Sequence, residues 1–176
     1  MKSSASAHLV PLLASLLTAL LLTACAANPD QLALGLSEAD VVAAVGPPSQ
    51  RVTLADGGSR MLYSRQPAGQ EVYLTDFDAQ GRLIRRQQML DEAVFARLAA
   101  AIAAGEFTRE DVEAQFGPPA EKSNVYSFNG IVWTYRYRQD GFNRLWHVHI
   151  DPQGVVRRAY STDERRGPGN QFFGSF

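Results

Sequence analysis

The tripeptide Gly-Pro-Pro occurs twice in this chain, at residues 46–48 and, 71 positions later, at residues 117–119. When residues 36–48 are aligned with residues 107–119, 6 of 13 positions are identical. A match of this length at a fixed spacing indicates that one structural unit has been duplicated. The fold therefore has to accommodate two copies of a small building block.

Each copy of the matched segment has the signals of a short helix with both ends specified. A hydroxyl residue is followed three positions later by Asp, which is the spacing of a capping box. The pairs are Ser37 with Asp40 and Thr108 with Asp111. At the other end, Gly46 and Gly117 can adopt positive φ, and the prolines that follow lack the N–H group needed to continue a helix. The sequence thus predicts a short helix before each Gly-Pro-Pro.

Extended segments follow each predicted helix. In one strand of each copy, alternate residues are suited to a shared buried face. These residues are Tyr73, Thr75 and Phe77 in the first copy and Trp146, Val148 and Ile150 in the second. An Asp-x-x-Gly turn, at 78–81 and at 151–154, then leads to a last strand. Each copy is expected to contain a helix and three or four antiparallel strands.

A single unit of this kind has a one-sided sheet with little to cover it, so two units are expected to share helices and cover each other's apolar surface. Residues 91–104 have apolar side chains at helical spacing before Gly105, which predicts a helix packed on the second sheet. Its counterpart at residues 29–34 is expected to be short or absent. The predicted fold class is α+β, a tandem repeat of a small unit with short helices packed on a three- to four-stranded antiparallel sheet.

The N-terminus resembles a bacterial lipoprotein signal. Residues 9–22 are almost wholly apolar but shorter than the roughly 20 residues that cross a bilayer. They end in Leu22-Thr23-Ala24-Cys25, which places small residues before the sole cysteine. The resemblance implies cleavage after Ala24 and acyl chains on Cys25, which together form a stable anchor. Ala26, where inner-membrane lipoproteins commonly carry Asp, favours the periplasmic face of the outer membrane.

The order of these features resembles the SmpA/OmlA (BamE-like) family of bacterial outer-membrane lipoproteins. The shared features are the lipoprotein signal, the helix ending in Gly-Pro-Pro, a W-x-Y strand at 133–135 and a strand closing on Asp151-x-x-Gly154. The resemblance covers residues 36–88 and 107–160. It implies a non-catalytic binding or scaffold module in envelope integrity or outer-membrane protein assembly. The doubled unit also resembles secreted β-lactamase-inhibitory proteins, so an inhibitor-like protein is an alternative.

The predicted division of the chain has five parts. They are a lipoprotein signal peptide at 1–24, an N-terminal linker at 25–35, a first repeat at 36–90, a second repeat at 91–161 and a flexible C-terminal tail at 162–176. The 17 basic and 18 acidic residues nearly balance, which gives no sign of nucleic-acid binding.

Few side chains suited to catalysis remain once the signal is removed, so we expect no enzyme activity, no cofactor and no metal. Of the three histidines, His8 leaves with the signal, and His147 and His149 remain. Together with Asp151 they occupy alternate positions of one strand, about 7 Å apart, which is too far to share one ion on a straight strand. A ligand or metal site at these three residues is kept as an alternative.

The outward strand face is a candidate binding surface, because arginine and aromatic residues supply much of the energy of protein interfaces. An ordinary solvated sheet face is the alternative interpretation. Its candidate residues are Leu74, Arg136, Arg138, Leu145, His147 and His149, and the tail adds Phe172 and Phe173. The expected partner is an envelope protein.

We predict that the mature protein begins at Cys25 and exceeds the mass of the unmodified polypeptide by its acyl chains. Mass spectrometry of protein extracted from membranes checks this, and Cys25→Ala should abolish the added mass. An unmodified mature N-terminus would contradict the prediction.

Overall fold

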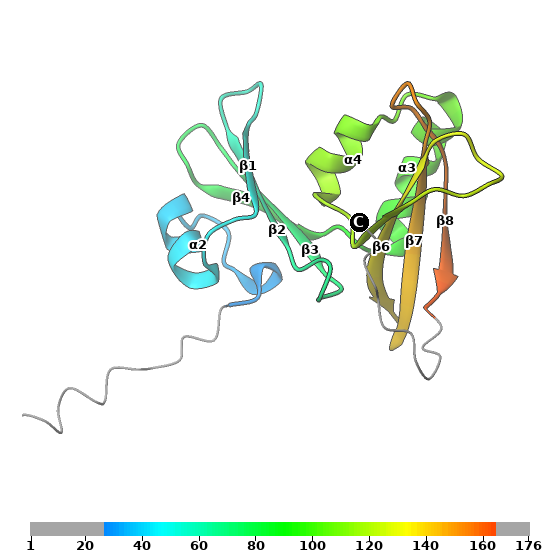
Figure 1. Ribbon diagram of the computed structural model, residues 1–176. Coiled ribbons are helices and arrows are strands. Elements are labelled where there is room, and N and C mark those ends of the chain that lie inside the picture. Colours follow the sequence, from blue (N-terminus) through cyan, green and yellow to red (C-terminus); the bar gives the residue numbers. More distant parts are fainter. Residues whose placement is uncertain (1–26, 165–176) are drawn as a thin grey trace, which may run out of the picture.

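A computed structural model describes residues 27–164, so the sites expected at Cys25, Phe172 and Phe173 lie outside the described residues. Two four-stranded antiparallel sheets dominate the fold (Figure 1). The first unit contains η2 (Pro29–Gln31), α2 (Glu38–Val45), β1 (Gln50–Thr53), β2 (Ser59–Ser64), β3 (Val72–Phe77) and β4 (Leu83–Gln88). The second contains α3 (Glu92–Ala104), α4 (Arg109–Phe116), β5 (Glu121–Ser123), β6 (Ile131–Gln139), β7 (Phe142–Ile150) and β8 (Val156–Asp163). The predicted tandem α+β architecture is confirmed.

The two units agree in small irregularities as well as in the order of their elements. An isolated bridge joins Ser37 to Arg82 in the first unit and Thr108 to Val155 in the second. A register shift also interrupts each sheet at the same place, near the end of β3 and near the end of β7. Agreement at this level is expected of a duplicated unit.

The helix ends follow the signals in the sequence. Capping boxes at Ser37 and Thr108 begin α2 and α4, and both helices end at a glycine with positive φ. Helix α3 begins after Asp91 and ends at Gly105, which is in the left-handed conformation. Its counterpart in the first unit is the single turn η2. No helix in the described part of the chain is long and apolar enough to cross a membrane.

The first sheet packs its inner face on α2 and η2. This core comprises Leu32, Val41, Met61, Tyr63, Tyr73, Phe77 and Leu83. Leu32 is only 7% exposed, so the segment predicted as a linker at 25–35 contributes to the first core. A buried leucine here completes the cover that one short helix cannot provide.

A second, larger core lies between the two sheets. Helices α3 and α4 pack against the inner face of the second sheet, where Phe95 stacks on Trp146 with ring centroids 4.2 Å apart. The same cluster includes Leu62, Val72 and Leu74 from the other side of the first sheet. Figure 1 shows α4 between the sheets. The order of layers is therefore α2, first sheet, α3 with α4, and second sheet.

This arrangement corrects the prediction that Leu74 lies on an open outward face. Leu74 does point away from α2, but it is 1% exposed because the second unit covers it. The tail boundary also changes, since β8 continues to Asp163, beyond the predicted end of the second repeat at residue 161.

The β2–β3 connection also joins the units through the edge of β6. Strand β5 pairs with β6 only as far as Thr134. Next along that edge, the Gln66 side-chain amide donates to the Arg136 carbonyl at 2.7 Å and accepts from the Arg136 N–H at 3.2 Å. The glutamine thus pairs with backbone groups of β6 where the neighbouring strand has ended.

Gly117 and Gly46 give a test of the contact between the units. A Cβ atom at Gly117 would lie 2.6 Å from Cδ2 of Leu62, whereas one at Gly46 would meet nothing within 4 Å. Both residues have positive φ with ψ close to 180°, a region that is essentially limited to glycine, so alanine at either position strains the backbone by about 1–3 kcal/mol. We expect Gly117→Ala to lower the free energy of unfolding by about 1–3 kcal/mol more than Gly46→Ala, because buried Leu62 must move.

Urea denaturation of the two variants measures this difference. The Leu62→Ala/Gly117→Ala double variant should lose less free energy of unfolding than the sum of the losses in the two single variants. Equal losses for Gly117→Ala and Gly46→Ala would contradict the contact.

Candidate binding surface

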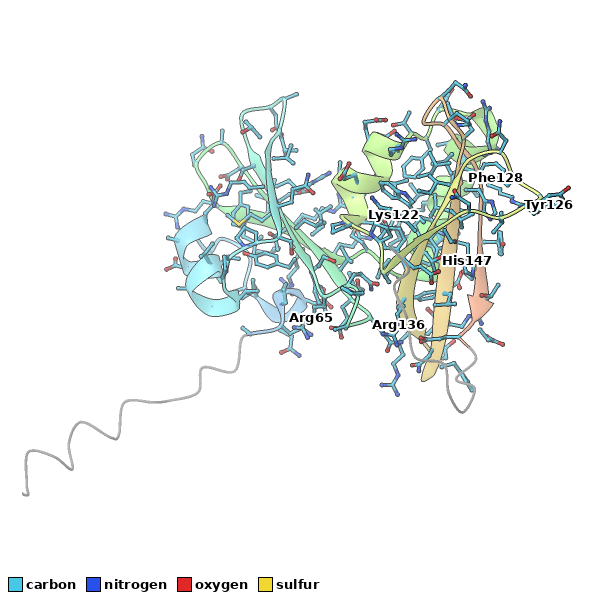
Figure 2. All side chains as sticks on the ribbon, viewed as in Figure 1. Arg65, Lys122, Tyr126, Phe128, Arg136 and His147 are labelled. Atoms are coloured by element: carbon cyan, nitrogen blue, oxygen red, sulfur yellow. The ribbon has the colours of Figure 1, made fainter. Side chains whose placement is uncertain are left out.

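The helices α3 and α4 cover only one face of the second sheet. Strand alternation places a different set of side chains on the other face. They are Val132, Thr134, Arg136 and Arg138 of β6, Leu145, His147 and His149 of β7, and Arg158, Tyr160 and Thr162 of β8. We call this surface the open face. Figure 2 shows His147 on it, with Tyr126 and Phe128 on the loop that precedes β6.

Equivalent positions of the two sheets differ in chemistry on this side. Leu62 lies opposite Leu74 in the first sheet, and Thr134 lies opposite His147 at the matching place in the second. The two leucines are 2% and 1% exposed because they form the contact between the units. At this pair of positions, covered leucines in the first unit are replaced by polar residues in the second. The next pair shows the reverse, because the Arg60–Asp76 ion pair of the first unit corresponds to Val132 and His149.

His147 joins three strands through its ring. Its Nδ1 atom lies 3.0 Å from the hydroxyl of Thr134 on β6, and its Nε2 atom lies 2.9 Å from the hydroxyl of Thr162 on β8. Burial lowers the pKa of His147, against the opposing effect of the Glu121 carboxylate. The imidazole is therefore neutral at pH 7, with one nitrogen donating and the other accepting.

His149 belongs to an aromatic cluster beside this polar row. Its ring centroid lies 4.9 Å from that of Phe128 and 5.4 Å from that of Tyr160. The side chain is 1% exposed, and its Nδ1 atom has no hydrogen-bond partner among the described residues. Burial lowers the pKa of His149, and the Arg158 and His147 side chains lower it further. Phe128 and Tyr160 thus enclose a neutral imidazole.

Asp151 takes no part in either histidine environment. Its Oδ1 atom accepts the N–H groups of Gln153 and Val155 at 3.0 and 2.9 Å, and its Oδ2 atom accepts from Arg157 Nε at 2.6 Å. Despite the opposing effect of desolvation, these hydrogen bonds lower the pKa of Asp151. Within residues 27–164, no three His, Cys, Asp or Glu side chains are grouped closely enough to hold a metal ion. The alternative ligand set at His147, His149 and Asp151 is therefore not assembled.

The two arginines proposed from the sequence have different surroundings. Arg136 pairs with Glu164 through Nε at 2.8 Å, and its Nη1 atom donates to the Pro67 carbonyl at 3.1 Å. It helps to join the two units. Arg138, two residues later on β6, is exposed. Arg138 is consequently the more accessible of the two candidates for partner binding.

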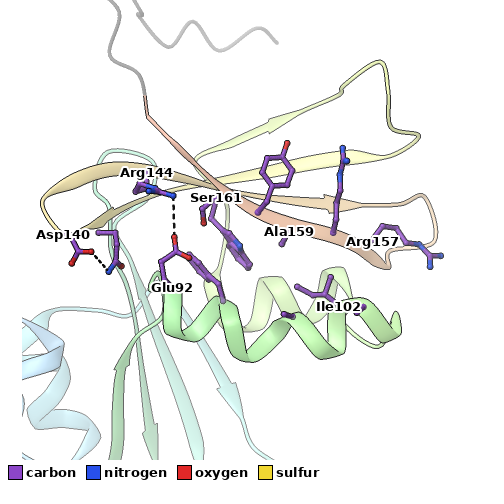
Figure 3. Close-up of a pocket in the computed structure, with 14 residues that line it drawn as sticks. Glu92, Ile102, Asp140, Arg144, Arg157, Ala159 and Ser161 are labelled. Atoms are coloured by element: carbon purple, nitrogen blue, oxygen red, sulfur yellow. Dashed lines mark hydrogen bonds and ion pairs between the residues drawn. The ribbon is translucent and has the colours of Figure 1, made fainter.

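A groove of about 680 Å³ runs between α3 and β8 (Figure 3). Its apolar lining includes Phe95, Ala99, Ile102, Ala103, Trp146 and Ala159. The sequence predicted α3 but not this groove, because helical spacing does not specify how far a helix lies from the edge of a sheet. Exposed alanines on one side of α3 are the only signal that could have suggested it.

Charged side chains close one end of the groove. Arg144 Nη2 lies 3.9 Å from Glu92 Oε1, and Arg144 Nη1 lies 3.3 Å from Asp163 Oδ1. The Tyr137 hydroxyl donates to Glu92. Burial and this carboxylate raise the pKa of Tyr137 to about 12. The phenol therefore stays protonated at neutral pH and holds Glu92 in place.

No protein-family model and no curated protein matches this chain. Among solved structures, it is similar to an osmotically inducible lipoprotein, OsmE, with 22% identity, coverage of 40% of this chain and 77% of that one, and a TM-score of 0.30. It is also similar to a DUF4309 family protein (YjgB) from Bacillus subtilis, with 19% identity, coverage of 73% and 78%, and a TM-score of 0.30. One of the two is thus described as a lipoprotein, the class expected from the motif at Cys25. Similarity this weak assigns neither a family nor a function.

The histidines predict how stability depends on pH. Their folded-state pKa values lie below the value of about 6.5 expected in the unfolded chain. As the pH falls below about 6.5, the unfolded state binds protons that the folded state excludes. The free energy of unfolding should therefore decrease between pH 7 and pH 5.

We expect His149→Leu to change stability by no more than about 1 kcal/mol at pH 7, because leucine removes a buried nitrogen that has no partner. The variant should lose less stability than the parent between pH 7 and pH 5. Urea denaturation of the mature protein at both pH values measures this. Parallel losses in variant and parent would contradict the assigned environment of His149.

Proposed function

We propose that this protein is an outer-membrane-anchored periplasmic lipoprotein that acts as a non-catalytic binding or scaffold module. Its role is in envelope integrity or outer-membrane protein assembly, as the resemblance to the SmpA/OmlA family implies. Through the open face of the second sheet it binds an envelope protein.

The observation that carries this proposal is the different chemistry of one central pair of equivalent sheet positions. Leu62 and Leu74 make an intramolecular contact in the first unit, whereas Thr134 and His147 occupy the matching positions of the second. Thr134 is 6% exposed and His147 is half-buried, and the two are hydrogen-bonded to each other, so their polar groups are satisfied without a partner. Exposed Arg138 supplies a charge suited to protein recognition.

The existing hydrogen bonds of His147 and Asp151 support a non-catalytic role. Both ring nitrogens of His147 are hydrogen-bonded to threonines. Asp151 is held by its turn and by Arg157. A general base needs a nitrogen or oxygen free to reach a substrate proton. Neither residue offers one in this arrangement.

The position of the anchor supports binding through the second unit. Cys25 precedes Ala27 by two residues, and the Ala27 N–H donates to the Ala44 carbonyl of α2 at 2.9 Å. With acyl chains on Cys25 as proposed, the first unit would lie close to the lipid surface, because two residues span at most about 7 Å. This would leave the second unit for periplasmic partners.

Site-specific photocrosslinking in intact envelopes tests this function. A photoreactive residue at position 138 or 126 should capture an envelope protein identified by mass spectrometry. The matched control is position 84, since Ile84 is also an exposed strand residue, 53% exposed, but belongs to the first sheet. Arg138→Glu should reduce recovery of the same protein severalfold without lowering thermal stability.

Capture from position 84 as efficient as from positions 138 and 126 would contradict a specific open face. Capture from none of the three would contradict the binding function itself.

A further inference from the structure

Strand β8 forms an edge of the second sheet. The strand order is β5-β6-β7-β8, so β8 pairs with β7 on one side, and no strand of residues 27–164 pairs with its other side (Figure 1). The edge strand is 8 residues long. An edge of this length is a template for pairing with another chain.

The backbone groups that face outward from this edge follow from its pairing with β7. The Glu164 N–H donates to the Asn143 carbonyl at 3.0 Å. Hydrogen bonding alternates along an antiparallel strand, so Tyr160 also points its backbone groups toward β7. The N–H and C=O groups of Ala159, Ser161 and Asp163 consequently point away from the sheet.

We infer that a second copy of this chain pairs with this edge, β8 against β8, across a two-fold axis at Tyr160. Ala159 then lies opposite Ser161 of the second copy, and their outward backbone groups can exchange hydrogen bonds. Arg157 is the residue of β8 that the register shift leaves without a partner on β7. Counted in the same register, its long side chain comes beside Asp163 of the second copy. Because the two-fold axis repeats every contact, the pairing gains two equivalent ion pairs between Arg157 of one copy and Asp163 of the other.

The charges select this register over its neighbours. Side chains of directly opposite residues lie on the same face of a sheet. The register between the two copies can therefore change only in steps of two residues. A shift of the axis by one residue toward the start of β8 places Arg157 opposite Ser161, and a shift in the other direction places it opposite a position beyond the end of β8. Both alternatives lose the ion pair with Asp163.

Both charged side chains are accessible for such pairing. The side chain of Arg157 is 54% exposed and that of Asp163 is 75% exposed. Arg157 uses Nε in its ion pair with Asp151. Its guanidinium has further donors in the same plane, so a second carboxylate can bind without breaking that contact. Asp163 uses Oδ1 in its ion pair with Arg144, which leaves Oδ2 of Asp163 for the second copy.

The groove beside β8 leaves room for the second copy. Its α3 wall exposes the small side chains of Ala99 and Ala103, which allow another element to approach closely. On the opposite face, Tyr160 is 44% exposed and would meet Tyr160 of the second copy. The pairing joins the two sheets into one and places both open faces on the same side. It does not depend on the proposed binding function.

A single cysteine at the axis tests the pairing in the full-length chain in cell envelopes. Opposite Cα atoms of a pair without backbone hydrogen bonds lie about 4.5 Å apart, within the range that a disulfide bridges. Mild oxidation of Tyr160→Cys should therefore give a reducible dimer on a gel. Arg138→Cys, which places the cysteine on β6 of the same sheet, should give at least severalfold less dimer.

Charge substitutions in the Tyr160→Cys background test the register. Arg157→Asp and Asp163→Arg should each reduce the dimer yield severalfold, and the two together should restore it. Thermal unfolding of each variant verifies that it is folded. Absence of the dimer, equal dimer from Arg138→Cys, or failure of the folded double variant to recover would overturn the proposal. So would dimer formation only after removal of residues 165–176, since these residues would then occupy the edge.

Discussion

Burial of the outer side of the first sheet against the second unit is the contact on which the rest of the structure depends. Leu62, Val72 and Leu74 join the core that contains α3 and α4. Each of these side chains loses nearly all its contact with water, which contributes roughly 1.5–3 kcal/mol per side chain. The contact makes one body of two units that have separate sheets.

This contact also makes the duplication asymmetric. Helix α4 packs on its own sheet and on the other side of the first sheet, whereas α2 packs only on its own sheet. The first sheet is therefore covered on both faces at its centre. The second sheet keeps an open face, and Thr134 and His147 stand where the first unit has leucines. The same packing leaves the second sheet, and not the first, with a face available for the binding proposed above.

The sheet edges are treated differently as well. Part of the β6 edge is paired with β5, and beyond it the Gln66 side chain binds the backbone of Arg136. On β8, alternating backbone groups point away from the sheet, beside a groove lined by small side chains. A chain that covers one edge with a side-chain amide and leaves another open has a surface suited to further strand pairing.

The helices and strands of this protein could be predicted from local signals in the sequence. Capping boxes, glycines and turn residues act within a few positions of each other, so Ser37, Thr108, Gly105 and the Asp-x-x-Gly turns specified helix and strand ends correctly. Strand alternation likewise identified the buried set around Phe77 and Trp146. These features depend on local backbone chemistry, which a single sequence contains.

The cover of each sheet face, in contrast, is a property of the folded chain as a whole. Strand alternation shows that Leu74 and His147 point away from their own helices, but it cannot show that the second unit buries one of them and leaves the other on an open face. The roles of Arg136 and Gln66 also depend on partners about 70 positions away in the chain. Docking of the units is set by shape and burial across the whole fold, and no local signal in the sequence encodes it.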